Sequence, residues 1–175
     1  TKGPDLPVAI PAALALSAGD RLYVLGFPAG KEQVLKLFSI GKGEKAWTPE
    51  PDGPGGAGSS YGTALDGKLY TVVPHKYIAI FDTRTETWET TEAPQSPRSP
   101  AVGHYRGEVW VMGGRSKEGG KVSYIYNPGS KQWRKGPGLP CELVWGCAFN
   151  IAGDLHLNGG GAGRCYSNRT FRLRE

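Results

Sequence analysis

Residues 109–120 read VWVMGGRSKEGG, and this stretch decides the fold. A run of apolar, β-favouring residues leads into two adjacent glycines, an arginine and a polar loop. Paired glycines at a strand end indicate a close approach between backbones or dihedral angles that other residues disfavour. Three similar stretches occur in the chain: RLYVLGF at 21–27, KLYTVVP at 68–74 and DLHLNGG at 154–160. The chain is therefore predicted to be a repeat with a period of about 45 residues.

Each repeat contains the pattern of four short strands. An apolar run and a tight turn precede the stretch, and Asp66-Gly67 is a strong hairpin signal. An alternating segment and a polar turn follow it, and then a tryptophan begins a fourth strand: Trp47, Trp88 or Trp133. With 27 Gly and 14 Pro in 175 residues, the composition also favours short strands joined by turns. Four strands per repeat of this length predict the blades of an all-β propeller.

The third repeat resembles the kelch motif. Its Gly113-Gly114 pair, Tyr124, Tyr126 and Trp133 carry the whole pattern. The other repeats match in part, with Gly26-Phe27, Val73-Pro74 and Gly159-Gly160 at the glycine pair and no tryptophan ending the last one. The resemblance implies a kelch-type β-propeller in a single domain, 1–175, with four repeats of four-stranded antiparallel blades. Their approximate ranges are 8–52, 53–95, 96–140 and 141–175. We expect the glycines and tryptophans to be structural, with the indoles packed between blades.

The first residues, TKGPDLP, match RKGPGLP at 134–140 in five of seven positions. Residues 1–7 are therefore predicted to complete the last blade by pairing with the strand around 170–174, which removes an open sheet edge. Two arrangements remain open: a small closed propeller, or part of a larger one. In the second case we expect a homo-oligomer or another chain to complete the ring.

Composition and charge exclude several function classes. The net charge of +5 comes from scattered lysines and arginines, so no nucleic-acid partner is expected. No apolar run reaches the length of a membrane span, and no signal peptide is evident. Cys141, Cys147 and Cys165 lack metal-ligand spacing and are expected to be reduced thiols, which indicates a cytoplasmic protein.

No catalytic constellation is evident, so an enzyme is not expected. His75, His104 and His156 fall in different repeats. The glycine-rich segment at 159–164 lacks the Lys-Ser/Thr ending of a phosphate loop. No cofactor or metal is therefore expected. The alternatives are a kelch-fold enzyme such as a sugar oxidase or mutarotase, and an actin-binding or scaffold protein.

The function that the kelch resemblance implies is protein binding on the loop face of the propeller. In kelch families such modules often serve as substrate receptors of cullin-type ubiquitin ligases. Arg98 and Arg115 can each hold a carboxylate or phosphate through two hydrogen bonds, which indicates an acidic or phosphorylated peptide. The candidate partner-binding residues are Ser59, Ser60, His75, Lys76, Arg98, Ser99, Arg115, Ser116, Trp145 and Arg164.

Overall fold

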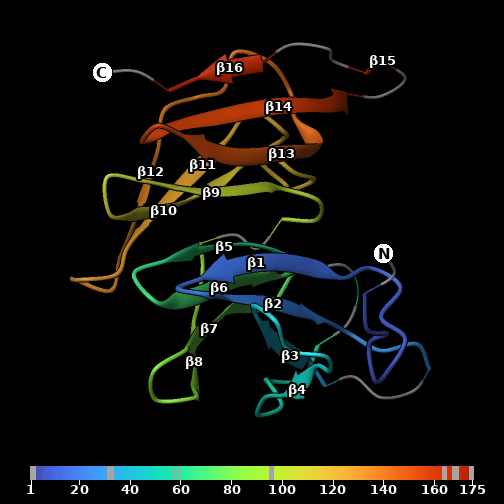
Figure 1. Ribbon diagram of the computed structural model, residues 1–175. Helices are drawn as coiled ribbons and strands as arrows, with labels where there is room; N and C mark the ends of the chain where they lie inside the picture. Colours follow the sequence, from blue (N-terminus) through green and yellow to red (C-terminus); the bar gives the residue numbers. More distant parts are fainter. Residues whose placement is uncertain are drawn as a thin grey trace. The chain divides into compact units, whose positions relative to one another are not determined.

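The computed structural model describes residues 3–30, 34–56, 58, 60–94, 97–162, 165–166 and 170–173. All the regular elements of these residues are β-strands, which confirms the all-β prediction (Figure 1). The strands of the first two sheets are β1 (Leu14–Ala18), β2 (Arg21–Gly26), β3 (Lys36–Gly41), β4 (Thr48–Pro49), β5 (Tyr61–Leu65), β6 (Lys68–Val73), β7 (Tyr77–Asp82) and β8 (Thr87–Thr91). The strands of the last two are β9 (Ala101–Tyr105), β10 (Glu108–Met112), β11 (Ser123–Asn127), β12 (Gln132–Lys135), β13 (Val144–Ile151), β14 (Asp154–Ala162), β15 (Cys165–Tyr166) and β16 (Thr170–Arg172).

The strands form four antiparallel sheets of four, which we call blades 1 to 4. In blades 1 to 3 the strands lie side by side in chain order, β1 to β4, β5 to β8 and β9 to β12. Blade 4 differs, because β15 and β16 both pair with β14. Each pairs with a different part of β14, so the two short strands together take the place of a third strand. The predicted blade is thus confirmed, and its hairpins arise from turns such as Asp66-Gly67, where both residues have positive φ.

The chain divides into two compact units. Unit 1 spans residues 1–91 and contains blades 1 and 2, and unit 2 spans 92–175 and contains blades 3 and 4. Within unit 1 the first strands, β1 and β5, are in contact, and within unit 2 β9 and β13 are in contact. Adjacent first strands are what neighbouring blades of a propeller require. The boundaries of a single domain and the closure of the ring stay predictions.

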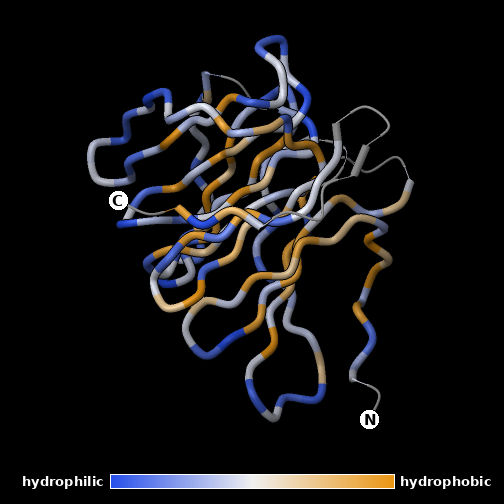
Figure 2. The backbone as a smooth tube through the Cα atoms, turned by 90° about the horizontal axis from the view of Figure 1, so that it is seen from above, coloured by the Kyte–Doolittle hydropathy of each residue, from blue (hydrophilic) through white to orange (hydrophobic). Residues whose placement is uncertain are grey.

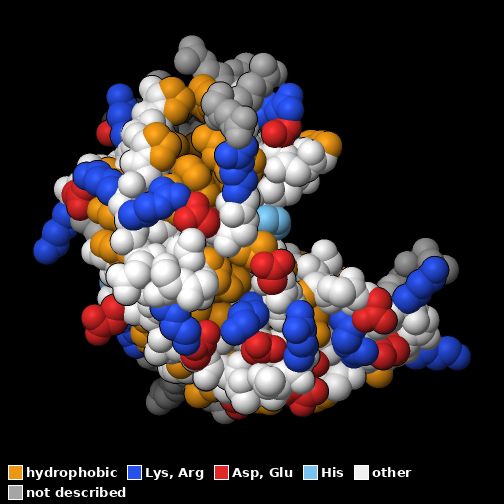
Figure 3. Space-filling view, turned by 90° about the vertical axis from the view of Figure 1, so that its left-hand side faces the viewer, with side chains coloured by type: hydrophobic (Ala, Val, Ile, Leu, Met, Phe, Trp, Pro, Cys, Tyr) orange, Lys and Arg blue, Asp and Glu red, His pale blue; other side chains and the backbone are white. Residues whose placement is uncertain are grey.

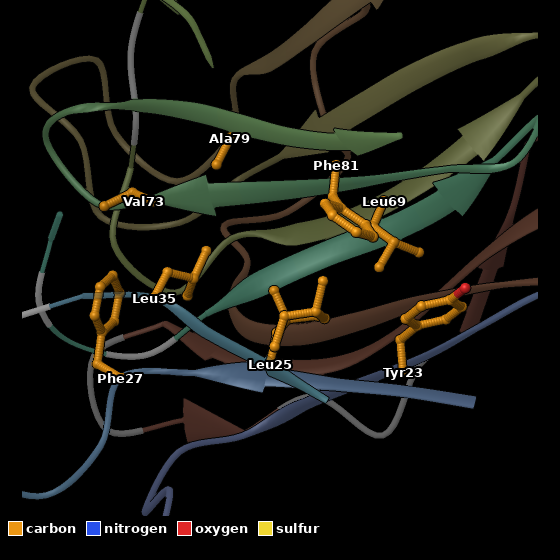
Figure 4. Packing of buried hydrophobic residues seen from close by; sticks show 9 residues of the cluster. Tyr23, Leu25, Phe27, Leu35, Leu69, Val73, Ala79 and Phe81 are labelled. Carbon is orange, nitrogen blue, oxygen red and sulfur yellow. The ribbon is translucent and has the colours of Figure 1, made fainter. Parts of the chain in front are cut away.

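The core of unit 1 lies between its two blades. Alternate residues of β2 and the residue after it, Tyr23, Leu25 and Phe27, point toward blade 2 (Figure 4). Leu69 and Phe81 of blade 2 meet them there, both fully buried. Alternation with period two therefore sends one face of each strand into this core. Figure 2 shows the result along the chain, with apolar strand segments joined by hydrophilic turns.

Unit 2 has an equivalent core. Trp110 and Met112 of blade 3 pack against Leu155 and Leu157 of blade 4. Gly103 on β9 makes this approach possible, because a Cβ there would lie 2.5 Å from Leu155 Cδ1. The core of each unit is thus built from two neighbouring blades.

Trp88 packs against the neighbouring blade as predicted, whereas the contact of Trp133 lies within its own blade. Trp88 packs on the core of unit 1, with its ring centroid 5.0 Å from that of Phe81. Its Nε1 donates a hydrogen bond of 2.9 Å to the carbonyl oxygen of Pro51, in the segment that leaves blade 1. Trp133 lies 5.0 Å from Tyr126, and its buried Nε1 has no hydrogen-bond partner. These indoles are structural.

The N-terminal segment lies against blade 1. Trp47 Nε1 donates a hydrogen bond of 3.1 Å to Pro4, so Pro4 serves Trp47 as Pro51 serves Trp88. Residues 3–7 form no strand, while Thr1, Lys2 and Arg174 lie outside the described residues. The pairing of residues 1–7 with the last blade therefore stays a prediction.

Candidate functional site

The Gly113-Gly114 pair ends β10 by turning its backbone against the start of blade 4. Both glycines have positive φ, 64° and 83°, which side chains rarely adopt. Gly114 N donates a hydrogen bond of 2.6 Å to the carbonyl oxygen of Leu143, the residue before β13. A Cβ on Gly114 would also lie 2.8 Å from the carbonyl oxygen of Arg98. The glycines therefore let three segments of unit 2 converge, and their predicted structural role is confirmed.

Arg98 and Arg115 meet at this point. They form an isolated antiparallel bridge, with Arg115 N donating to Arg98 O at 2.7 Å and Arg98 N donating to Arg115 O at 3.1 Å. Because the pairing is through the backbone, it fixes the origin of both side chains. Both residues are exposed. The structure thus brings together the two arginines that the sequence proposed.

Trp145 joins the same cluster from the start of β13. Its backbone N–H donates a hydrogen bond of 3.0 Å to the carbonyl oxygen of Ser99. Its side chain is 55% exposed, and the Arg115 guanidinium carbon lies 4.8 Å from its ring centroid. This distance suits a cation–π interaction. Trp145 and Ser99 also have positive φ, 60° and 56°, and such strain at non-glycine residues is typical of functional sites.

A pocket of about 320 Å³ opens beside this cluster. Its lining residues are Gly114, Arg115, Ser116, Gly119, Gly120, Glu142, Val144, Trp145 and Gly161. Ser116 Oγ donates a hydrogen bond of 3.2 Å to the carbonyl oxygen of Gly119, which orders the loop. Arg115 and Glu142 give the pocket one charge of each sign. It is therefore less basic than the sequence suggested.

Several predicted residues are not among those that line this pocket. His75 and Lys76 form the exposed turn between β6 and β7, in unit 1, and His75 has a φ of 60°. Ser60 is only 7% exposed, so it is not available as a surface contact. Ser59 and Arg164 lie outside the described residues. Arg98 contributes its backbone to the cluster, but its side chain does not line the pocket.

Glu142 and Val144 line the pocket without having been predicted. In the sequence they stand in CELVW, where nothing distinguishes them from any residues that begin a strand. They reach the pocket because Leu143, between them, bonds through its backbone to both Gly114 and Gly120. No local pattern reports this contact between blades, so it could not have been found from the sequence.

The histidines take separate places in unit 2 and unit 1. His104 accepts a hydrogen bond of 2.7 Å from Asn150 Nδ2 through its carbonyl oxygen, and the His156 ring stacks on Phe149. Within the part of the chain that the structure describes, no group of three His, Cys, Asp or Glu residues could hold a metal ion. Nor does any helix among the described residues have the length and apolar character to cross a membrane.

Comparisons with known proteins support the fold. A solved structure described as "Structure of YjhT" superposes with a TM-score of 0.78 at 16% sequence identity. The match covers 98% of this chain but 64% of that one, so the chain spans less than two thirds of its length. No protein-family model and no curated protein matches. The fold is therefore that of a β-propeller of four-stranded antiparallel blades, and membership of the kelch family stays a prediction.

Proposed function

We propose that the protein is a peptide-binding module of the kelch type, and that it binds an acidic or phosphorylated segment at the Arg115 pocket. The observation that carries this proposal is the pairing of an exposed arginine with an exposed tryptophan over an open pocket. Trp and Arg are the residues most enriched at the energetic centres of protein interfaces. The cluster therefore has the composition of an anchor site.

Arg115 supplies the anion-binding group. A guanidinium above an indole keeps its N–H edges available, because the cation–π contact uses the ring face. Those edges match the two oxygens of a carboxylate or phosphate. Arg98 places a second positive charge next to the pocket without lining it, since the backbone bridge holds the two residues side by side.

The negative charge of Glu142 narrows the class of ligand that the pocket is expected to bind. An isolated carboxylate in the pocket repels an anion, so a ligand with acidic groups throughout would bind poorly. A peptide can donate hydrogen bonds from its backbone N–H groups to the Glu142 carboxylate. At the same time, an acidic side chain of the peptide can bind Arg115. This pairing of opposite charges favours a peptide over a free anion.

The finer role follows from the kelch resemblance alone. We propose that the bound segment belongs to a cytoplasmic substrate of a cullin-type ubiquitin ligase, for which this propeller acts as receptor. Co-purification of tagged protein with cullin subunits tests that role separately. Its failure would leave peptide binding at the Arg115 pocket intact.

The pocket is tested with a panel of acidic and phosphoserine peptides and matched Asn, Gln and Ser versions, titrated while tryptophan fluorescence is recorded. We expect the acidic members to bind and Arg115→Ala to weaken them about tenfold or more, since lost charge-assisted bonds cost about 2–5 kcal/mol. Arg115→Lys should recover part of the affinity, because lysine keeps the charge without the planar fork.

Lys117→Ala is the matched control, because Lys117 is exposed on the same loop and does not line the pocket. It removes the same charge from the same loop and should leave the affinity nearly unchanged. Equal affinity of acidic and neutral peptides, or equal losses in Arg115→Ala and Lys117→Ala, would contradict the proposal.

A further inference from the structure

A second pocket, of about 390 Å³, lies in unit 1, where blade 1 packs against blade 2. Blade 1 and the residue that follows β4 contribute Arg21, Tyr23, Glu44 and Glu50 to its lining, and the turn between β7 and β8 contributes Glu86. Three of these side chains are acidic and one is basic. The pocket therefore has an excess of negative charge, in contrast to the Arg115 pocket, where one acid stands beside one base.

The basic side chain is already paired with one of the acids. Arg21 Nη1 and Nη2 donate hydrogen bonds of 2.9 and 3.1 Å to the two carboxylate oxygens of Glu44. Arg21 Nε and Nη2 also donate to Ser39 Oγ, at 3.1 and 3.0 Å. The charge of Glu44 is thus matched within the fold, and the excess negative charge belongs to Glu50 and Glu86.

Glu50 is positioned by a buried serine. Ser39 is 0% exposed, and its Oγ donates a hydrogen bond of 2.5 Å to Glu50 Oε1. Tyr23, which is only 4% exposed, lies directly opposite Ser39 on β2, at one end of the row of core side chains in Figure 4. Burial, followed by the negative charge of Glu50, raises the pKa of Tyr23, so its phenol stays neutral. Neither hydroxyl group cancels the charge of Glu50, which is left for a cation.

This polar arrangement departs from the repeat. Ser39 pairs with Tyr23, and the residues at the same place in blades 2 and 3 are Ile80 and Ile125. Both isoleucines are buried, at 2% and 1% exposure. The fold is therefore satisfied by an apolar residue here, which packs without a hydrogen-bond partner and is often more stable than a buried polar network. Departures of this kind from the packing rule of a fold concentrate at functional sites.

We propose that this pocket binds the guanidinium group of a ligand through Glu50 and Glu86. A guanidinium carries N–H donors in a planar fork, so it can bond to one carboxylate with two of them and still reach another. Pro49 and Pro51 also line the pocket and offer apolar surface to the alkyl chain behind such a group. Pro51 is held in place by the hydrogen bond from Trp88 of blade 2. Among the described residues no group of three acids, histidines or cysteines could hold a metal ion, which favours an organic cation.

The ligand can be an arginine of a peptide or a small guanidinium compound, and calorimetric titration distinguishes them. The probes are a blocked arginine tripeptide, matched tripeptides with citrulline or lysine, and methylguanidine. We expect the arginine tripeptide to bind and the citrulline tripeptide, which has nearly the same shape without the charge, not to bind. Methylguanidine of comparable affinity assigns the pocket to a small compound, and much weaker binding of methylguanidine assigns it to a peptide.

Glu50→Gln and Glu86→Gln test the two acids. Each should weaken binding of the arginine tripeptide about tenfold or more, because each replaces a charged acceptor by a neutral one. Asp66→Asn is the matched control. It removes the same charge from unit 1 at a residue that does not line the pocket, and asparagine tolerates the φ of 50° found there. Its affinity should stay close to that of wild type.

The proposal is overturned if neither guanidinium probe binds, if the arginine and citrulline tripeptides bind equally, or if Asp66→Asn loses as much affinity as Glu50→Gln. Equal binding of the lysine tripeptide would overturn the choice of a guanidinium. Circular dichroism checks that each variant folds. Acidic peptides should bind all three variants like wild type, because none of these residues lines the Arg115 pocket. Failure of this proposal is therefore distinguishable from failure of the proposed function.

Discussion

Tyr124 shows how a single side chain of this fold acquires unusual chemistry. Its hydroxyl donates a hydrogen bond of 2.7 Å to Glu118 Oε1, and Glu118 also pairs with Lys135 at 2.8 Å. Burial, followed by the hydrogen bond and the negative charge of Glu118, raises the pKa of Tyr124 to about 12. The neutral phenol is therefore stabilised by folding, since ionisation would leave a charge in a buried site beside a carboxylate.

This pKa predicts a pH dependence. The raised pKa means that Tyr124 contributes stability below pH 10, the usual tyrosine value, and that this contribution is lost as the pH rises toward about 12. Glu118→Gln keeps a hydrogen-bond acceptor but removes the charge, so the Tyr124 pKa should fall. Ultraviolet absorbance of tyrosinate during an alkaline titration measures it, and Tyr124→Phe identifies the signal. An identical titration in wild type and Glu118→Gln would show that the charge has no influence.

At the scale of the element, each blade carries an ion pair at the start of its second strand. The first residue there is Arg21, Lys68, Glu108 or Asp154, and the respective partners are Glu44, Asp82 with Glu89, Arg134 and Arg172. The first residue of the second strand is therefore the basic partner in blades 1 and 2 and the acidic partner in blades 3 and 4. Acidic and basic side chains are interspersed on the face drawn in Figure 3. The repeat conserves the pairing between strands but not the sign of either member.

Because the two charges stand in the opposite order in blade 2, we expect blade 3 to tolerate an exchange of the charges of Glu108 and Arg134. Glu108 and Arg134 lie 2.5 Å apart across the blade, and Glu89 occupies the position of Arg134 in blade 2. Glu108→Lys alone and Arg134→Glu alone should each lower the free energy of unfolding by about 1 kcal/mol, because each places like charges together. The double variant, which has the order of blade 2, should recover most of the loss. Urea unfolding at low and high salt measures the coupling; purely additive losses would contradict it.

At the scale of the whole molecule, two segments outside the sheets accept hydrogen bonds from tryptophans. Pro51 accepts the indole N–H of Trp88, and Pro4 accepts that of Trp47. The N-terminal segment thus uses the same contact as the segment between blades 1 and 2. In the match between TKGPDLP and RKGPGLP, Pro4 aligns with Pro137, which instead accepts a hydrogen bond of 2.6 Å from Ser123 Oγ in blade 3.

Deleting residues 1–7 should therefore destabilise unit 1. Trp47 Nε1 would lose its acceptor, which costs about 0.5–1.5 kcal/mol for a hydrogen bond. If residues 1–7 also complete the last blade, the shortened protein should aggregate at the exposed edge. Thermal unfolding and light scattering measure both effects. Deleting only Thr1 and Lys2 keeps Pro4 and is the control for the hydrogen bond; equal stability of both shortened forms would refute the role of Pro4.

Much of the architecture could be predicted from local patterns. Alternating residues such as Tyr23, Leu25 and Phe27 reveal strands because a strand turns successive side chains to opposite faces. The recurring Tyr, Trp and Gly positions then reveal four related blades, the last of which lacks the tryptophan. Both signals lie within about 45 residues, so they are legible without knowing how distant segments pack.

The binding cluster was predictable only in part. The sequence by itself determined the β class, the repeat, the structural glycines and tryptophans, and the candidates Arg98, Arg115 and Trp145. Only the tertiary structure decided that the two arginines share a backbone bridge, that Glu142 faces Arg115 in one pocket, and that Ser60 is buried. The physical reason is that these outcomes depend on contacts between blades. Such contacts join residues that the local pattern of hydrophobicity and turns does not connect.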